Sequence, residues 1–148
     1  MTDTINYIDT AVENFFLHTL EIDSKRVGQE VLENIYTTEI KIADIECEYD
    51  FVLCMREPLL NILAQKLLFE ESPDQEMLID LLNESANLII GNAKVLWEEQ
   101  EGATLSLTPP AYQGFFEKSF SKELDAKLFF HAGDEPIMIG VQRKETVA

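Results

Sequence analysis

The segment from about Asp74 to Glu99 constrains the fold most strongly, because it has the pattern of a long helix that is apolar over most of its surface. At 3.6 residues per turn, its polar positions fall in one stripe about 80° wide. The stripe comprises Asp80, Glu84, Asn87, Gly91, Lys94 and Glu98. A helix of this kind must be packed on several sides. The pattern therefore predicts that only the stripe meets water or a partner.

The composition of this stripe is unusual for a solvated helix face. Asn87 is a poor helix former, and Gly91 costs about 1 kcal/mol relative to Ala. Glu84 and Asn87 are three residues apart, so their side chains are neighbours, and Gly91 leaves room for close approach. Two interpretations follow, a docking surface and an ordinary solvated face. The flanking Asn83 and Asn92 are expected to be buried amides that backbone groups satisfy.

Periodicity predicts the first half of the chain as a helix, a loop and two strands. The helix should run over 4–20, the loop over 23–28 and the first strand over 37–42. The next segment alternates, with Ile45, Cys47, Tyr49, Phe51 and Leu53 on one face and Glu46, Glu48 and Asp50 on the other. One face is therefore expected in the core and the other in water, as in an antiparallel sheet.

The second half adds two helices and three strands. Pro58 suits the first turn of a helix that ends before Pro73, and the long helix follows. Strands are expected over 104–107, 126–131 and 136–142, with a turn at Gly133 and Asp134. The chain, 1–148, is thus predicted to be a single α+β domain with helices packed on a mainly antiparallel sheet.

The charge balance limits the possible partners. Eleven Lys and Arg stand against 28 Asp and Glu, a net charge of −17. This disfavours nucleic acid and anionic membrane surfaces, and it fits a folded partner with a basic rim, although acidity also serves solubility alone. The apolar runs are too short to span a bilayer, and the N-terminus lacks the features of a signal peptide. We therefore expect a cytoplasmic protein.

Cysteine and histidine provide no metal-binding pattern. Cys47 and Cys54 fall on one predicted strand, where seven residues span roughly 23 Å, so they cannot bridge each other within that strand. The sequence has no Cys-x-x-Cys pair, and His18 and His131 lack metal-ligand spacing. No metal site and no cofactor of its own is expected.

Four positions carry a family resemblance. The signature of the CheC/CheX/FliY chemotaxis phosphatases is matched by Asp80, Glu84, Asn87 and Pro110. Three residues separate Asp80 from Glu84, two separate Glu84 from Asn87, and 22 separate Asn87 from Pro110. CheC-like members repeat the motif on the first helix, where this chain has Phe16 in place of the Asn. FliY-like members carry a further domain for which this chain is too short. The chain therefore resembles single-site CheX proteins.

The resemblance implies a CheX/CheC-like fold and hydrolysis of the aspartyl phosphate of a CheY-like response regulator, in chemotaxis or related two-component signalling. Asn87 would orient the attacking water, and Glu84 would pair with the partner's active-site lysine. Asp80, Gly91 and Lys94 would contact the partner, and Pro110 would hold a structural turn. The resemblance also implies Mg²⁺ on the response regulator rather than on this chain, and a homodimer.

Two alternatives stay open. A domain of the same fold can bind a response regulator without catalysis, although the intact Glu84 and Asn87 favour an enzyme. An unrelated acidic α+β domain can serve assembly, for example as a dimerisation unit. Failure to bind any phosphorylated receiver domain would favour this last function.

Overall fold

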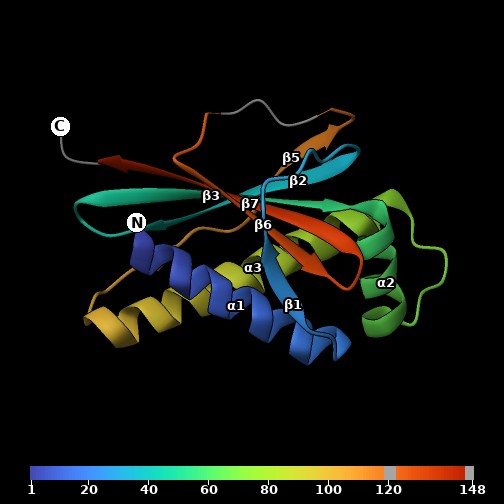
Figure 1. The fold of residues 1–148 in the computed structure, drawn as a ribbon, viewed down its shortest axis with the longest axis horizontal. Helices are drawn as coiled ribbons and strands as arrows, with labels where there is room; N and C mark the ends of the chain where they lie inside the picture. The colour runs from blue at the N-terminus through green and yellow to red at the C-terminus, as the bar shows by residue number, and fades with distance from the viewer. Residues whose placement is uncertain (119–122, 146–148) are drawn as a thin grey trace.

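The computed structural model of the chain describes residues 1–118 and 123–145. Within them, helices lie against one antiparallel sheet, which confirms the predicted α+β class (Figure 1). The helices are α1 (Thr2–Leu20), α2 (Glu57–Leu68) and α3 (Gln75–Glu101). The strands are β1 (Ser24–Val27), β2 (Ile35–Ala43), β3 (Cys47–Arg56), β4 (Ser106–Leu107), β5 (Ala111–Phe116), β6 (Ala126–Ala132) and β7 (Glu135–Glu145).

The sheet places the strands in the order β1-β6-β7-β3-β2-β4, and β5 also pairs with β2. The described pairings are all antiparallel. β3 lies between β2 and β7, with Phe51 opposite both Ile40 and Val141. The short β4 and the longer β5 both follow α3 in the chain, so the sheet edge beside β2 is built from the segment that leaves α3.

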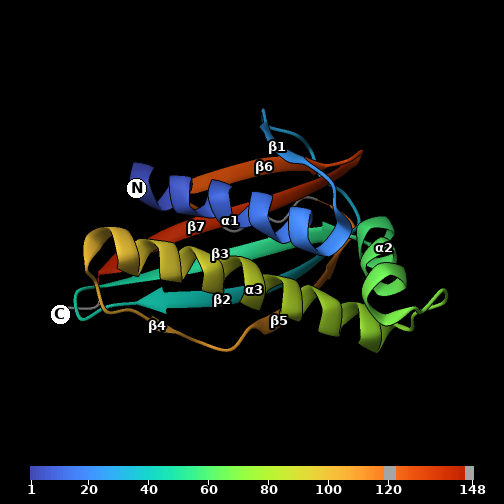
Figure 2. The same cartoon turned by 90° about the horizontal axis from the view of Figure 1, so that it is seen from below.

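α1 and α3 run alongside each other over one face of the sheet, and α2 lies near one end of α3 (Figure 2). The main core fills the space between these helices and the sheet. Phe16 from α1, Leu82 from α3 and Phe51 from β3 are all buried there. Burial of each such side chain stabilises the fold by roughly 1.5–3 kcal/mol. This packing holds α3 rigidly on its apolar sides.

The opposite face of the sheet is not the wet face that the alternation of β3 predicts. Val52 and Cys54 are buried there in a second cluster with Leu32 and Phe129, and Asp50 has an exposed fraction of 0%. Leu124 also packs onto this cluster and lies against Gly140 of β7. Alternation indicates which side chains share a face, but loops from elsewhere in the chain decide whether that face is covered.

Two strands were not predicted. The segment expected as a loop contains β1, whose Lys25 and Arg26 offer no apolar alternation; it pairs with β6, and Arg26 forms an ion pair with Asp9 of α1. β5 pairs with β2 through a bulge next to Gly114, which has φ of +132°. An irregular edge strand directly after two prolines has a weak local signal.

Three apolar side chains assigned to buried faces are exposed. Ile45 lies in the turn between β2 and β3 and is 90% exposed, and Leu88 and Val95 of α3 are nearly half exposed. Turn residues need not continue the alternation of the strand they precede. The elements packed on α3 cover only part of its apolar surface, so Leu88 and Val95 are left at the protein surface.

The prediction that the two cysteines do not bridge each other is confirmed, since Cys47 and Cys54 are free and buried. Burial raises the pKa of the Cys54 thiol to about 11. Each helix in the described part of the chain is too short or too polar to cross a membrane.

Candidate functional site

A groove of about 540 Å³ runs between α3 and the segment that follows it. One side is part of the polar stripe of α3, and the other side is a wall formed by residues 107–110. The lining residues are Asp80, Asn83, Glu84, Asn87, Leu107, Thr108, Pro109 and Pro110. The structure therefore brings together Asp80, Glu84, Asn87 and Pro110, which the motif connects only by spacing.

The groove is built on a helix with defined ends. The side chain of Asp74 caps the N-terminus of α3 by accepting a hydrogen bond from the backbone N–H of Met77 at 2.9 Å. At the other end, Gly102 has φ of 64°, and its N–H donates to the carbonyl of Glu98. The site residues lie between these caps, over the buried Leu82, Ala86 and other apolar side chains. Their positions are consequently set by a rigid element.

Three polar side chains of the groove are free to meet a partner. Asp80, Glu84 and Asn87 are exposed. Among the residues that the structure describes, their side chains form no hydrogen bond or ion pair. An Asn in mid-helix that makes no local hydrogen bond contributes nothing evident to stability. Its amide is therefore available for a water molecule or a docked group.

The wall of the groove is hydrogen-bonded to β2. The hydroxyl oxygen of Thr108 accepts a hydrogen bond from the backbone N–H of Lys41 at 3.0 Å, and the N–H of Thr108 donates to the carbonyl of Lys41. Pro109 and Pro110 follow with restricted φ. Pro110 thus lies in a stiff segment at a fixed distance from the stripe.

The flanking asparagines are satisfied differently from the prediction. Asn83 accepts a hydrogen bond at 2.7 Å from the hydroxyl of Thr38 in β2, and Asn92 accepts one at 3.0 Å from Asn14 in α1. Both partners are side chains rather than backbone groups, and both asparagines are half-buried. The role of Thr38 was missed because nothing local connects residue 38 of a strand with residue 83 of a helix.

Gly91 and Lys94 continue the stripe beyond the residues that line the groove. A Cβ added at Gly91 would lie 3.7 Å from a methyl carbon of Leu107, an ordinary contact with the chain's own wall. Lys94 donates to Glu98 at 2.9 Å, and Glu98 also accepts from the backbone N–H of Leu105 at 3.0 Å. This backbone hydrogen bond, assisted by Lys94, lowers the pKa of Glu98. Lys94 and Glu98 therefore connect the end of α3 to the segment that leads into the wall.

The first helix carries no second copy of the arrangement. Phe16, which occupies the position of the motif's Asn, is fully buried in the main core, and Asp9 is paired with Arg26. The position on α1 that would carry the second Asn is therefore part of the core.

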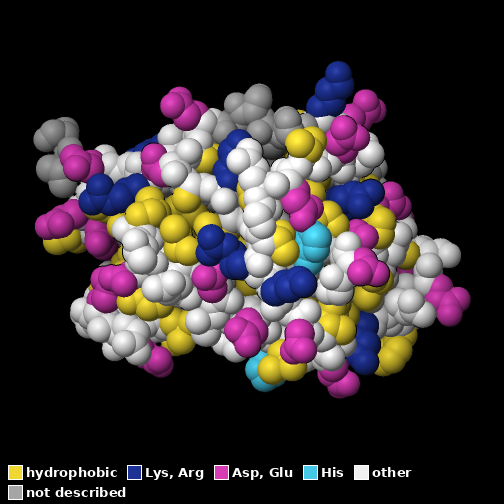
Figure 3. Space-filling view, viewed as in Figure 1, with side chains coloured by type: hydrophobic (Ala, Val, Ile, Leu, Met, Phe, Trp, Pro, Cys, Tyr) yellow, Lys and Arg dark blue, Asp and Glu magenta, His cyan; other side chains and the backbone are white. Residues whose placement is uncertain are grey.

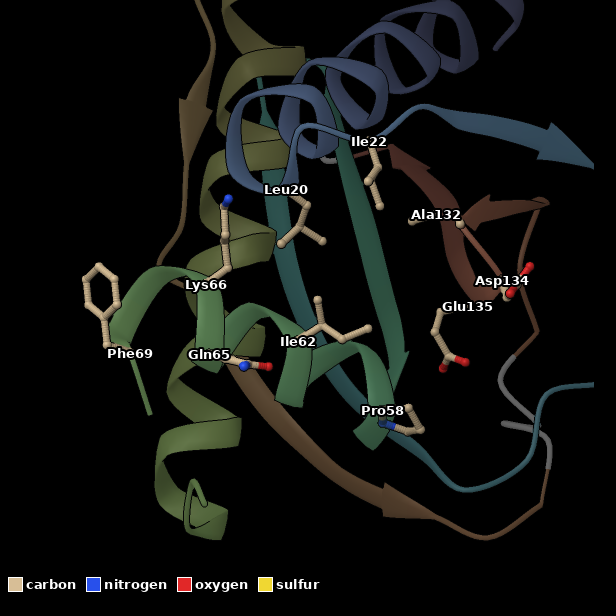
Figure 4. A pocket seen from close by; sticks show the side chains of 11 residues that line it. Leu20, Ile22, Pro58, Ile62, Gln65, Lys66, Phe69, Ala132, Asp134 and Glu135 are labelled. Carbon is tan, nitrogen blue, oxygen red and sulfur yellow. The ribbon is translucent and has the colours of Figure 1, made fainter. Parts of the chain in front are cut away.

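A separate hollow of about 580 Å³ lies between the end of α1, α2 and the β6–β7 turn (Figure 4). Leu20, Ile22 and Ile62 point into it, and Lys66 and Asp134 lie at its edge. It shares no lining residue with the groove on α3. Its lining is mainly apolar and also includes Gln65, Lys66, Asp134 and Glu135.

In a comparison with protein families, residues 40–115 match the family described as "Chemotaxis phosphatase CheX". The match includes the end of β2, all of β3, α2 and α3, and both sides of the groove. No curated protein matches the chain in the sequence comparison.

Solved structures share the fold over nearly the whole chain. A CheC-like superfamily protein from Shewanella sp. PV-4 is 18% identical, with a TM-score of 0.81, coverage of 97% of this chain and 99% of that one. The chemotaxis protein CheX from Vibrio vulnificus is 15% identical, with a TM-score of 0.80 and coverage of 95% and 96%. CheX in the CheX–CheY–BeF₃–Mg²⁺ complex from Borrelia burgdorferi is 21% identical, with a TM-score of 0.70 and coverage of 95% and 97%.

Proposed function

Because the chain belongs to the chemotaxis phosphatase CheX family, we propose that it hydrolyses the aspartyl phosphate of a CheY-like response regulator. The observation that carries the proposal is the pair Glu84 and Asn87, exposed without partners in the described structure and held on a helix that is capped and packed. The relative from B. burgdorferi that was crystallised with CheY supports the choice of partner.

Asn87 is proposed as the catalytic residue. An aspartyl phosphate is an acyl phosphate and is already reactive, so the phosphatase needs chiefly to hold a water in line with the phosphorus. The amide of Asn87 offers one acceptor and two donor hydrogens, which suffice to orient such a water. The water oxygen then bonds to phosphorus as the bond from phosphorus to the aspartate oxygen breaks. Inorganic phosphate is released and the carboxylate of the regulator's aspartate is regenerated, without a covalent intermediate on this chain.

Glu84 is proposed to fix the docking register. Its carboxylate projects from the same face of α3 as Asn87, three residues earlier, and is suited to pair with the lysine of the response regulator's active site. The response regulator's own Mg²⁺ and this lysine would balance the phosphoryl charge. Asp80, Gly91 and Lys94 are proposed as further contacts with the regulator. Lys94 would make its contact without leaving its ion pair with Glu98.

The test is phosphate release from a phosphorylated CheY-like response regulator, with and without the protein. Asn87→Ala should lower kcat/KM at least about 100-fold, because the water is no longer positioned. Its affinity for the regulator should stay within about threefold of the original. Glu84→Ala should weaken both binding and rate, because it removes a contact of the docked state.

Asn61→Ala provides the matched control, since Asn61 is an exposed amide on α2 that does not line the groove. Its activity should equal that of the unaltered protein. Full activity in Asn87→Ala would contradict the assignment of the catalytic residue. Binding without acceleration by the unaltered protein would indicate the non-catalytic binding module, and no binding to any phosphorylated receiver domain would indicate an assembly domain.

A further inference from the structure

Asn83 occupies the position in the groove where the stripe of α3 meets the sheet. It lies one residue before Glu84 and four before Asn87, so its side chain is a neighbour of the proposed catalytic amide on the same helix surface. It lines the groove together with Glu84 and Asn87, yet it is only half-buried. A group docked over Asn87 would therefore come within reach of Asn83.

A buried hydroxyl fixes the orientation of this amide. Thr38 has an exposed fraction of 0%, and its hydroxyl donates to Oδ1 of Asn83 at 2.7 Å. Because Oδ1 is held toward the sheet, Nδ2 is directed away from Thr38. Among the described residues Nδ2 has no hydrogen-bond partner, so two N–H donors are left for the groove.

The chemistry of the groove indicates what these donors can meet. Its charged side chains, Asp80 and Glu84, are both acidic. A phosphoryl group approaching beside two carboxylates is repelled unless hydrogen-bond donors face it. Asn83 supplies such donors without a positive charge, and they are already oriented before docking.

We propose that Asn83 contacts the substrate, donating a hydrogen bond from Nδ2 to a phosphoryl oxygen of the docked response regulator, and that Thr38 is the residue that positions it. The proposal rests on the phosphatase function proposed above. Because Thr38 binds the amide in the free protein, little side-chain freedom is lost when the contact forms. The site thus contains a second amide beside the catalytic one, with a different role.

Two substitutions at residue 83 test the contact. Asn83→Ala removes the donors. Asn83→Asp keeps the shape and the acceptor for Thr38, but it replaces the donors with an acceptor oxygen and adds a negative charge. Asn83→Ala should lower kcat/KM for the phosphorylated regulator about tenfold, the effect of losing one hydrogen bond of about 1.4 kcal/mol. Asn83→Asp should lower it further, because its negative charge also repels the phosphoryl group. Affinity of Asn83→Ala for the unphosphorylated regulator should change less than about twofold.

Asn92→Ala is the matched control, because Asn92 is also a half-buried amide of α3 held by a side chain and does not line the groove. It should retain full activity. Unfolding midpoints of all variants are measured alongside, and Asn83→Asp keeps the test informative should Asn83→Ala be poorly folded.

Thr38 is tested through rescue and coupling. Thr38→Val preserves the shape and removes the hydroxyl, and it should lower kcat/KM for the phosphorylated regulator about threefold, whereas Thr38→Ser should restore it. The double variant Thr38→Val with Asn83→Ala should be no slower than Asn83→Ala alone, because Thr38 acts through Asn83. A purely structural role for Thr38 would lower stability without this dependence.

The outcomes separate this inference from the proposed function. If the unaltered protein accelerates release and Asn87→Ala does not, but both variants at residue 83 are as active as the original, the contact is refuted while the phosphatase stands. Equal losses of affinity for phosphorylated and unphosphorylated regulator would also overturn it, since they would indicate a general docking contact. Absence of acceleration by the unaltered protein would overturn both proposals.

Discussion

At the scale of single residues, the same polar residue types have different roles according to their surroundings. Asn87 is exposed and has no partner among the described residues, Asn83 is held by Thr38, and Asn92 is held by Asn14. The partner of each amide decides whether it packs the domain or serves the groove. The motif spacing predicts Asn87 as the reactive amide, and the contacts distinguish the other two.

Asp50 is a residue whose burial the sequence pattern does not reveal. It lies on the covered face of β3, with Oδ2 2.9 Å from Nζ of Lys144 and Oδ1 3.8 Å from Nζ of Lys41. The carboxylate raises the pKa of Lys144. Both lysines remain partly exposed, which keeps their ammonium groups hydrated. The buried carboxylate therefore depends on two ion pairs at the surface of the sheet.

Asp50→Asn should lower the free energy of unfolding by about 1–3 kcal/mol, because the amide cannot pair with the two ammonium groups. Chemical denaturation measures this. Glu48→Gln is the control, since Glu48 also pairs with Lys41, at 3.3 Å, but from a partly exposed position. Its cost should stay below about 0.5 kcal/mol. An equal loss of unfolding free energy in the two variants would show that the burial of Asp50 does not strengthen its ion pairs.

At the scale of elements, the site depends on how α3 is joined to the segment after it. Glu98 accepts hydrogen bonds from Leu105 and Lys94 on one side, and Thr108 is bound to Lys41 on the other. These links hold the wall of residues 107–110 opposite the stripe. The helix supplies the polar groups, and the connection decides the width of the groove.

The link at Glu98 should be sensitive to acid. Its pKa is lowered by the backbone hydrogen bond from Leu105 and by Lys94, so its stabilising contribution is present above the ordinary value of 4.5 and is lost as pH falls through the folded pKa. Glu98→Gln should thus lower the unfolding midpoint at pH 6 more than at pH 3. Denaturation curves of both proteins across this range provide the measurement, and a difference that does not depend on pH would contradict the ion-pair role.

At the scale of the whole molecule, charge is distributed widely. The net charge is −17, and on the face shown in Figure 3 acidic side chains are interspersed with basic and apolar ones. The groove itself contains Asp80 and Glu84 but no basic side chain among its described lining residues. Attraction of a partner with a basic rim would therefore act both over a distance and at the site.

We expect association with the response regulator to depend on salt. Raising the ionic strength from about 50 to about 500 mM should lower the association rate constant several-fold, because screening shortens the range of the attraction. Stopped-flow binding measures it. Asp80→Asn should reduce the salt dependence, whereas Asp23→Asn, an exposed change outside the groove, should reduce it less. A rate that does not respond to salt would indicate that net charge serves solubility alone.

The homodimer implied by the family resemblance stays a prediction.

The sequence by itself determined the elements with strong periodicity and the residues of the motif. α1, α2 and α3 lie within a few residues of their predicted bounds, and Asp80, Glu84 and Asn87 of the stripe are exposed as expected. Helical periodicity and capping are local properties, so residues close in the chain suffice to reveal them. The same holds for Phe16, which indicates without any structure that α1 lacks the motif's Asn.

Only the tertiary structure decided which surfaces are covered and which distant residues meet. It buries Asp50 on a sheet face that the sequence predicted to be exposed, and it adds β1 and β5 to the sheet. It also brings Thr38 into contact with Asn83. It also sets the wall of residues 107–110 beside the stripe to form a groove. These features depend on contacts between segments far apart in the chain, and a local pattern contains no information on which segment will cover a given face.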